Sequence, residues 1–267
     1  MGAEESLREG KLDQCLTELQ AEVRNDPSNS ALRVFLFQLL AVLGQWDRSL
    51  RQLDVAGEMD AGTLAMVQTY RPLIQAEILR KNVMEGKRTP IVLGEPEEWI
   101  ALLIEALRVT AEGHPEKASE LRGRALEKAV AVPGDIDGTP FEWIADADSR
   151  LGPVLETVVG GHYTWVPFSC ISKIVIEPPE DLRDMVWSPA HFTWSNGGEA
   201  VGMIPTRYSG TEDSADPGLR LARRTEWEEI GAESWRGLGQ RMLTTDGGEY
   251  ALLDAREISL SQPGSEE

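Results

Sequence analysis

The sequence predicts an α+β fold in two parts: a tetratricopeptide-like helical repeat domain over residues 1–131, then a smaller β-rich α+β domain over residues 132–267. In the first half, apolar residues recur at helical spacing and the chain matches itself at a shift of 34 residues, the tetratricopeptide period. After Val132, glycines and prolines break the helical pattern, and six of the eight tryptophans follow. This change in composition places the domain boundary there.

The first two amphipathic segments predict a helical hairpin. The first segment has apolar residues at spacings of four, three and four, which give a helix one apolar face. These residues are Leu12, Leu16, Leu19 and Val23. Leucines over residues 32–43 repeat the pattern after a turn-forming stretch, with Ser30 as the expected N-cap.

The 34-residue shift aligns glycines, acidic residues and apolar residues of successive repeats. The aligned pairs include Gly10 with Gly44, Asp13 with Asp47, Leu16 with Leu50, Leu19 with Leu53 and Leu36 with Tyr70. A glycine permits the tight turn between two helices, and the small residue five positions later, Cys15 in the first copy, is expected to be buried. Later copies are degenerate, because Pro72 should kink or end its helix. A loop at 87–96 and two more helices to about Ala129 complete this half.

Short segments rich in aromatic and β-branched residues predict strands in the second half. They are residues 163–168, 171–176, 190–194, 200–204, 223–229, 235–243 and 249–254. Glycine turns at 196–198 and 246–248 favour a small antiparallel sheet or partly open barrel. The tail from about residue 259 is expected to be flexible.

The charge balance excludes several classes of function. The chain has 26 basic and 45 acidic residues, a net charge of −19, which repels nucleic acid and anionic membrane surfaces. An acidic N-terminus and the lack of a long apolar run predict a cytoplasmic protein with no membrane insertion. Two cysteines cannot build a disulfide framework or a four-cysteine zinc site. No nucleotide-binding glycine motif is present, and no cofactor is expected.

Two Asp-x-Asp pairs form the most suggestive acidic cluster. The pairs are Asp135/Asp137 and Asp146/Asp148. The spacing fails the EF-hand pattern, and aspartates favour turns, so a structural role is favoured and no metal is expected. An alternative remains open, in which Asp146 and Asp148 act with His162 or His191 as an enzyme or metal site.

A repeat array of helix pairs also predicts a groove that receives a peptide or helix. Residues off the core stripe on the first helix of each pair are the candidates for this surface. They are Arg33, Phe37, Gln38, Val67, Gln68 and Arg71. Phe37 would be the apolar anchor, and Arg33 or Arg71 would pair with carboxylates of the partner. Tryptophans of the second half are expected to fill the core rather than a ligand pocket.

Several stretches resemble a known family. Residues 32–47, which contain Leu43-Gly44-Gln45-Trp46-Asp47, and above all residues 136–156 are similar to the ImpE family, also called TagJ. The 136–156 stretch, called here the signature stretch, contains residues whose role stays unassigned: Asp137, Trp143, Asp146, Asp148 and Arg150. Residues 178–184 and 196–200 add to the resemblance, which covers nearly the whole chain.

The resemblance implies a cytoplasmic, non-enzymatic accessory protein of bacterial type VI secretion. Such a protein would bind an N-terminal helix of the small contractile-sheath subunit TssB and would be linked to sheath turnover by the ATPase ClpV. It carries over no catalytic residues. Two other classes remain open: the acidic Asp/His enzyme or metal site, and a structural scaffold that holds two partners.

Overall fold

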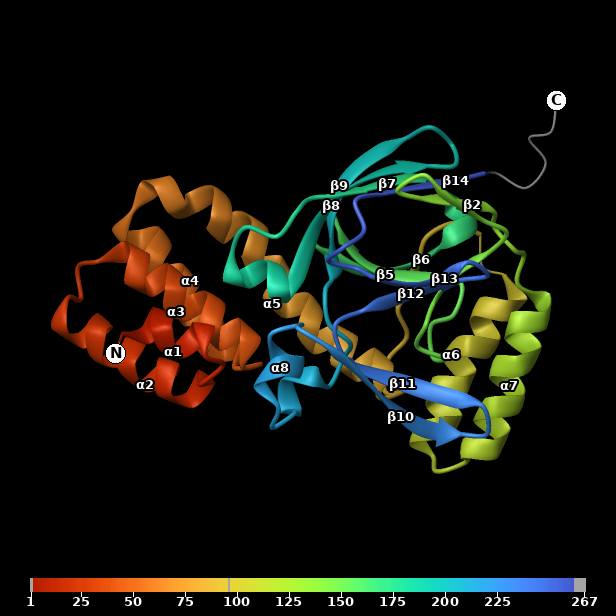
Figure 1. The fold of residues 1–267 in the computed structure, drawn as a ribbon, viewed down its shortest axis with the longest axis horizontal. Coiled ribbons are helices and arrows are strands. Elements are labelled where there is room, and N and C mark those ends of the chain that lie inside the picture. Colours follow the sequence, from red (N-terminus) through yellow and green to blue (C-terminus); the bar gives the residue numbers. More distant parts are fainter. Residues whose placement is uncertain (1, 96, 262–267) are drawn as a thin grey trace.

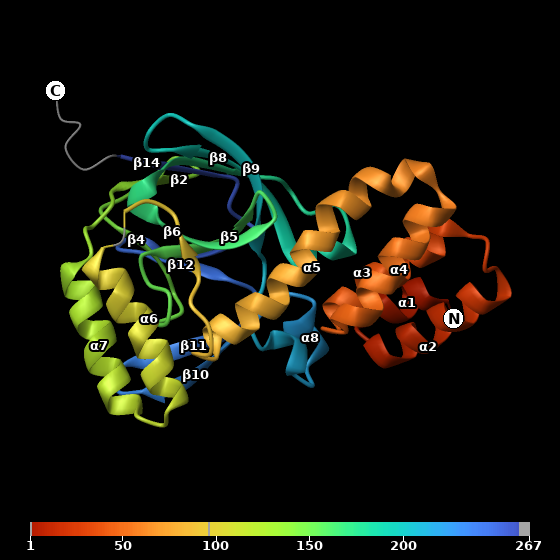
Figure 2. The ribbon, with the colours of Figure 1, turned by 180° about the vertical axis from the view of Figure 1, so that it is seen from behind.

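The computed structural model describes residues 2–95 and 97–261, and it shows a mixed α+β fold. Helices α1–α4 lie at one end of the molecule, and most strands form the other end, where α6 and α7 lie beside them (Figure 1). The helices are α1 (Ala3–Arg8), α2 (Leu12–Asn25), α3 (Ser30–Val42), α4 (Trp46–Met59), α5 (Leu64–Met84), α6 (Glu98–Ala111), α7 (Pro115–Lys128) and the short α8 (Pro217–Arg220). Both views show α5 running from the α1–α4 group to the sheet (Figures 1 and 2).

The main sheet has nine strands in the described part of the chain, in the order β1-β6-β5-β9-β8-β7-β14-β2-β3. They are β1 (Ile91–Val92), β2 (Gly134–Ile136), β3 (Thr139–Phe141), β5 (Val154–Val159), β6 (His162–Pro167), β7 (Ile171–Ile176), β8 (Trp187–Trp194), β9 (Glu199–Pro205) and β14 (Glu257–Leu260). Neighbouring strands are antiparallel except for β1, which runs parallel to β6. The sheet is therefore mainly antiparallel, as the turn signals indicate.

Two smaller sheets complete the second half. One contains β4 (Ile144–Asp146), β12 (Met242–Thr245) and β13 (Gly248–Ala251), and the other is the hairpin of β10 (Thr225–Gly231) and β11 (Ser234–Gly239). Helix α7 contacts β10, so the α6–α7 hairpin lies beside these strands. The sequence patterns give no sign of β2, β4, β5 or β14, because these strands are short or lack strict alternation of polar and apolar residues.

Glycines follow several helices at equivalent places, two residues after the last helical residue. Gly10 follows α1, Gly44 follows α3 and Gly113 follows α6, all with positive φ, a conformation that glycine adopts without steric cost. A Cβ on Gly44 would lie 2.5 Å from the side chain of Glu212. The helix start predicted at Ser30 is shifted by one residue, because the Asn29 side chain accepts hydrogen bonds from the amides of Ala31 and Leu32.

Pro72 does not end its helix, although an end there was one of the two outcomes expected from the sequence. Helix α5 continues through it for another twelve residues, to Met84. Leu73, Ile74 and residues further along α5 are buried, and this burial offsets the lost backbone hydrogen bond. The proline itself faces Gly161, where an added Cβ would lie 3.2 Å from Cβ of Pro72.

The core has two main parts, on opposite faces of the sheet. Tyr163 and Trp165 of β6 pack into a cluster with α1–α6, whereas Val166 joins a second cluster with β7, β8 and β12. The first cluster contains residues from both sides of the predicted boundary at 131/132. Trp165 and Trp187 are fully buried, as expected of core tryptophans, and Cys15 is buried as well.

The end of the chain differs from the predicted flexible tail. Ser259 and Leu260 belong to β14, where Ser259 pairs with Lys173 of β7 and with Asp135 of β2. The buried Leu260 side chain explains why the strand continues beyond residue 258. Residues 262–267 of the predicted tail lie outside the described residues.

Candidate functional site

A cluster of buried charges joins α5 to the strands. Arg80 Nε lies 3.0 Å from Glu156 Oε1, and Arg80 Nη1 lies 3.2 Å from Glu77 Oε2. Arg241 reaches the same Glu156 with Nη2 at 2.5 Å and contacts Asp146 with Nη1. Buried charges are tolerated when they are paired in this way. We call Glu77, Arg80, Asp146, Glu156 and Arg241 the buried cluster.

The carboxylates of this cluster have altered pKa values. Burial raises the pKa of Asp146 to about 6, although the Arg241 guanidinium acts in the opposite direction. Burial also disfavours the charged form of Glu156, but Arg80 and Arg241 outweigh it and hold the pKa of Glu156 below its usual value. The Tyr163 hydroxyl donates a further hydrogen bond to Glu156. Glu156 is thus the central anion of the cluster.

The remaining signature residues also make internal contacts, with one exception. Asp148 accepts hydrogen bonds from Arg150 Nη2 at 2.6 Å and from the Gly237 amide at 3.0 Å. The Asp137 carboxylate accepts the backbone amides of residues 256 and 257. Trp143 differs, because 38% of its surface is exposed. The aspartates and Arg150 therefore stabilise the fold, and Trp143 is left without such a role.

The alternative Asp/His site is not assembled. Asp146 and Asp148 are buried, and their charged partners are Arg241 and Arg150. Both candidate histidines, at 162 and 191, are exposed, and Nε2 of the second lies 3.3 Å from a carboxylate oxygen of Glu177. Among the described residues, no group of three His, Cys, Asp or Glu side chains could hold a metal ion. The geometry brings neither histidine to the two aspartates.

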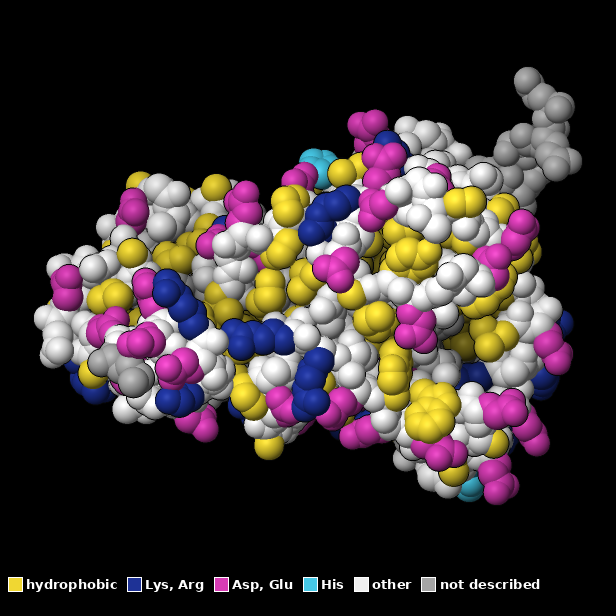
Figure 3. Space-filling view, viewed as in Figure 1, with side chains coloured by type: hydrophobic (Ala, Val, Ile, Leu, Met, Phe, Trp, Pro, Cys, Tyr) yellow, Lys and Arg dark blue, Asp and Glu magenta, His cyan; other side chains and the backbone are white. Residues whose placement is uncertain are grey.

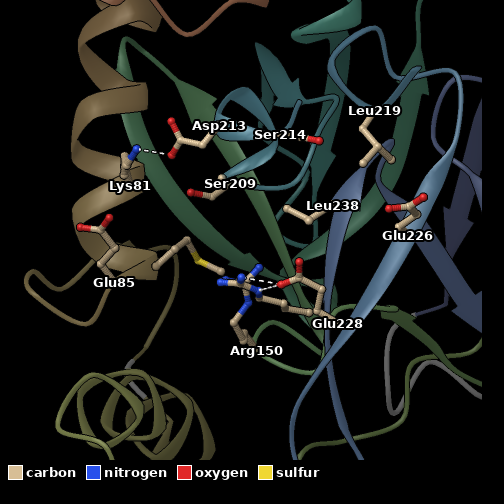
Figure 4. Close-up of a pocket in the computed structure, with 13 residues that line it drawn as sticks. Lys81, Glu85, Arg150, Ser209, Asp213, Ser214, Leu219, Glu226, Glu228 and Leu238 are labelled. Atoms are coloured by element: carbon tan, nitrogen blue, oxygen red, sulfur yellow. Dashed lines mark hydrogen bonds and ion pairs between the residues drawn. The ribbon is translucent and has the colours of Figure 1, made fainter. Parts of the chain in front are cut away.

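A polar cleft of about 430 Å³ lies between α5 and the β10–β11 hairpin (Figure 4). Its cations already have partners inside the protein. Lys81 Nζ lies 2.8 Å from Asp213, and Arg236 pairs with Glu228 at 2.5 Å. Arg150 pairs with Asp148. Because each positive charge is neutralised, the cleft offers no free cation to an anionic ligand.

A smaller groove of about 310 Å³ between α2, α3 and α4 has the opposite character. Each helix supplies residues from one face, at spacings of three, four or seven positions. The apolar lining consists of Val23, Leu36 and Leu40. The polar lining consists of Gln20, Gln52, Arg24, Arg33, Arg48 and Arg51. We call this surface the arginine groove.

The four arginines of the groove have no acidic partner among the described residues. Arg33 Nη1 donates to Gln52 at 2.9 Å, its Nε is buried without a hydrogen-bond partner, and Arg48 donates to Gln45. Such a gathering of unpaired cations is unusual in a chain with 45 acidic residues and 26 basic ones. The groove is therefore suited to receive carboxylates over an apolar floor.

Of the six residues predicted to bind a partner, only Arg33 lines this groove. Phe37, Gln38 and Val67 are buried; the Phe37 ring packs edge-on against Tyr70 with centroids 5.7 Å apart. These three are corrections to the predicted surface, because Phe37 of α3 packs against α5 and Val67 of α5 lies against Gly57 of α4.

The other two predicted residues, Gln68 and Arg71, are exposed on α5. Arg71 pairs with Asp54 at 2.5 Å, so its charge is already satisfied. Arg24, Arg48 and Arg51 were not predicted. Their helical spacing was visible in the sequence, but which helix faces meet was not.

No helix in the described ranges is long and apolar enough to cross a membrane.

The ImpE protein family matches residues 138–259. A type VI secretion system accessory component, TagJ of Pseudomonas aeruginosa, is 53% identical over 258 residues, which cover 97% of this chain and 90% of the relative. A crystal structure of a protein from Vibrio parahaemolyticus superposes with a TM-score of 0.90 at 26% identity, covering 99% of both chains. With a relative this similar over nearly its whole length, the chain belongs to the ImpE family of type VI secretion accessory proteins, also called TagJ.

Proposed function

We propose that this protein is a non-enzymatic, cytoplasmic adaptor of type VI secretion that binds an N-terminal helix of the small sheath subunit TssB. Family membership supports the setting, and the arginine groove is the observation that carries the binding role. The link to sheath turnover by ClpV is part of the same proposal. An adaptor that holds the end of a sheath subunit controls whether the ATPase reaches that end.

The proposed parts follow the boundary at 131/132. Residues 1–131 form a tetratricopeptide-like array, supported by the equivalent glycine turns at Gly10 and Gly44. The second part, residues 132–267, is β-rich over its described residues 132–261, which support the end of α5. The groove lies wholly on the first part, between its second, third and fourth helices.

The lining of the groove defines the partner it fits. An amphipathic helix could place its apolar side chains on Leu36 and Leu40. Carboxylates along the edge of that helix would meet guanidinium groups, which bind carboxylates with two parallel hydrogen bonds. An acidic edge is therefore the expected feature of the bound segment.

Calorimetric titration of the full chain with a peptide of the N-terminal TssB helix tests this proposal. Each partly exposed ion pair contributes about 1 kcal/mol, so Arg33→Ala or Arg51→Ala should weaken binding about fivefold and the double variant more. Arg124→Ala is the matched control, because Arg124 is exposed on α7 and does not line the groove. Unchanged affinity in the double variant would move the site elsewhere, and no binding by the unmodified chain would reject the TssB role.

A further inference from the structure

Trp143 lies at an apolar hollow of about 380 Å³ between the end of α7 and strand β4. The described part of the chain has nine exposed large hydrophobic side chains, and three of them, Leu126, Val130 and Trp143, line this hollow. Alanines at 129, 131, 145 and 147, with Ile144 and Pro153, complete its apolar lining. Figure 3 shows hydrophobic side chains exposed on this end of the molecule, near β11–β13 and α7. We call this surface the Trp143 hollow.

A fourth exposed hydrophobic residue, Trp235, is hydrogen-bonded to the lining of the hollow. The amide of Trp235 donates to Ser149 Oγ at 2.9 Å, and its carbonyl accepts the Ser149 amide at 2.9 Å. Ser149 lines the hollow. Apolar side chains gathered at one place on a soluble protein mark an interaction surface more often than single exposed residues do.

The fold does not account for the exposure of Trp143. Its neighbours in the signature stretch have internal partners, whereas the Trp143 indole N–H donates to no group among the described residues. A tryptophan that presents an apolar ring and a free donor at the surface is typical of the centre of a binding site.

Acidic side chains flank the hollow without ion-pair partners in the described part of the chain. Glu127 follows Leu126, Glu142 precedes Trp143, and Asp246 accepts the Glu142 amide at 2.7 Å. These three carboxylates leave a local negative charge around the apolar surface.

The nearby cations do not cancel this charge. Lys128 pairs with Glu98 of α6 at 3.1 Å. Arg124 lies one turn before Lys128, on the same face of α7. Leu126, two residues after Arg124, points to the other side of the helix. Arg124 and Lys128 therefore lie on a different face of α7 from Leu126, which lines the hollow.

We propose that the Trp143 hollow is a second docking surface, for a protein segment that carries an apolar anchor flanked by lysine or arginine. The anchor fills the hollow against the indole, and the basic flanks meet Glu127, Glu142 and Asp246. This surface has the opposite charge to the arginine groove and lies between α7 and β4 rather than on α2–α4, so the adaptor holds two chemically different partners. The proposal is independent of TssB binding.

Fluorine NMR of the full chain labelled with 5-fluorotryptophan tests it. The probe is a synthetic 16-residue amphipathic peptide of lysine and leucine, and a glutamate and leucine peptide of equal length is the control. Trp143→Phe assigns the resonance of Trp143. The lysine peptide should shift that resonance saturably, and the glutamate peptide should leave it in place. A resonance that moves equally with both peptides, or with neither, overturns the proposal.

Variants separate docking from general attraction to an acidic protein. Trp143→Ser should weaken binding of the lysine peptide about tenfold, as expected for a central aromatic anchor. Glu127→Gln with Glu142→Gln should weaken it a few-fold and reduce its salt dependence. Ile78→Ser is the matched control, since Ile78 is exposed on α5 and outside the hollow. Equal loss in Trp143→Ser and Ile78→Ser would also contradict the proposal, and thermal unfolding confirms that each variant is folded.

Discussion

Arg80 and Arg241 of the buried cluster differ from the four arginines of the groove in what surrounds them. Each of the two buried guanidiniums contacts two carboxylates, and both share Glu156. Within residues 2–95 and 97–261, the groove arginines form side-chain hydrogen bonds with glutamines or with no side chain. Arginine therefore has two roles in this protein. Beside the carboxylates of the buried cluster it holds α5 on the sheet, and in the groove, where no carboxylate is near, it is available to a partner.

The largest expected effect on stability comes from removing the charge of Glu156, the carboxylate that Arg80 and Arg241 share. Glu156→Gln keeps the size of the side chain but leaves two buried guanidiniums short of a negative charge, which should lower the free energy of unfolding by about 3–5 kcal/mol. Urea unfolding measures this loss. Glu228→Gln breaks the exposed pair with Arg236 and should cost less than about 1 kcal/mol. Similar losses for the two variants would mean that the cluster is no more critical than a surface pair.

Lowering the pH should change the stability that the same cluster contributes. The pKa of Glu156 is lowered from 4.5, so its stabilisation is complete above about pH 4.5 and is lost as the pH falls further. Asp146 acts in the opposite sense: with its pKa raised from 3.8 to about 6, the folded state takes up a proton first, and stability rises as the pH falls through that window.

The two effects together predict a free energy of unfolding that rises a little below about pH 6 and then falls below about pH 4.5. Urea titrations across this range measure it. Glu156→Gln should lose part of the fall, and Asp146→Asn should lose the rise. A wild-type curve that is flat from neutral pH to acid would show that neither carboxylate changes its pKa on folding.

The smallest expected effect is at the groove. Arg51 has no charged partner among the described residues, so Arg51→Ala should change the free energy of unfolding by less than about 0.5 kcal/mol. Thermal and urea unfolding measure it on the same protein used for binding. A loss well above that value would give the groove arginines a structural role and remove the contrast with the buried cluster.

Local patterns in the sequence predicted much of the fold. The glycines at 10 and 44 and the leucine spacing gave the helices of the array, and β6, β7, β8 and β9 agree with aromatic and β-branched runs. Strand β5 was missed, because five of its six residues are buried and it shows no alternation. Such a strand is recognised only when both of its neighbours in the sheet are known.

The sites were harder to predict than the fold. Arg33 lies off the apolar stripe of its helix and lines the groove, whereas Phe37 is buried, since a central helix buries more than one face. The carboxylates at 146 and 156 meet through Arg241, far along the chain from both. No spacing rule connects residues that far apart, so the buried cluster could not be foreseen.

The contacts between α5 and the strands also limit how this protein can be recombined. Glu77 and Arg80 lie in the second half of α5, and their partners Glu156 and Trp187 lie on the sheet. If these helices were joined to the sheet of a distant homologue without those partners, the buried Arg80 would keep Glu77 as its one carboxylate partner among the described residues, and Glu77 would lose the hydrogen bond from Trp187. Array and sheet are therefore a matched pair, and chimeras that exchange one must also carry over the residues of the other that meet α5.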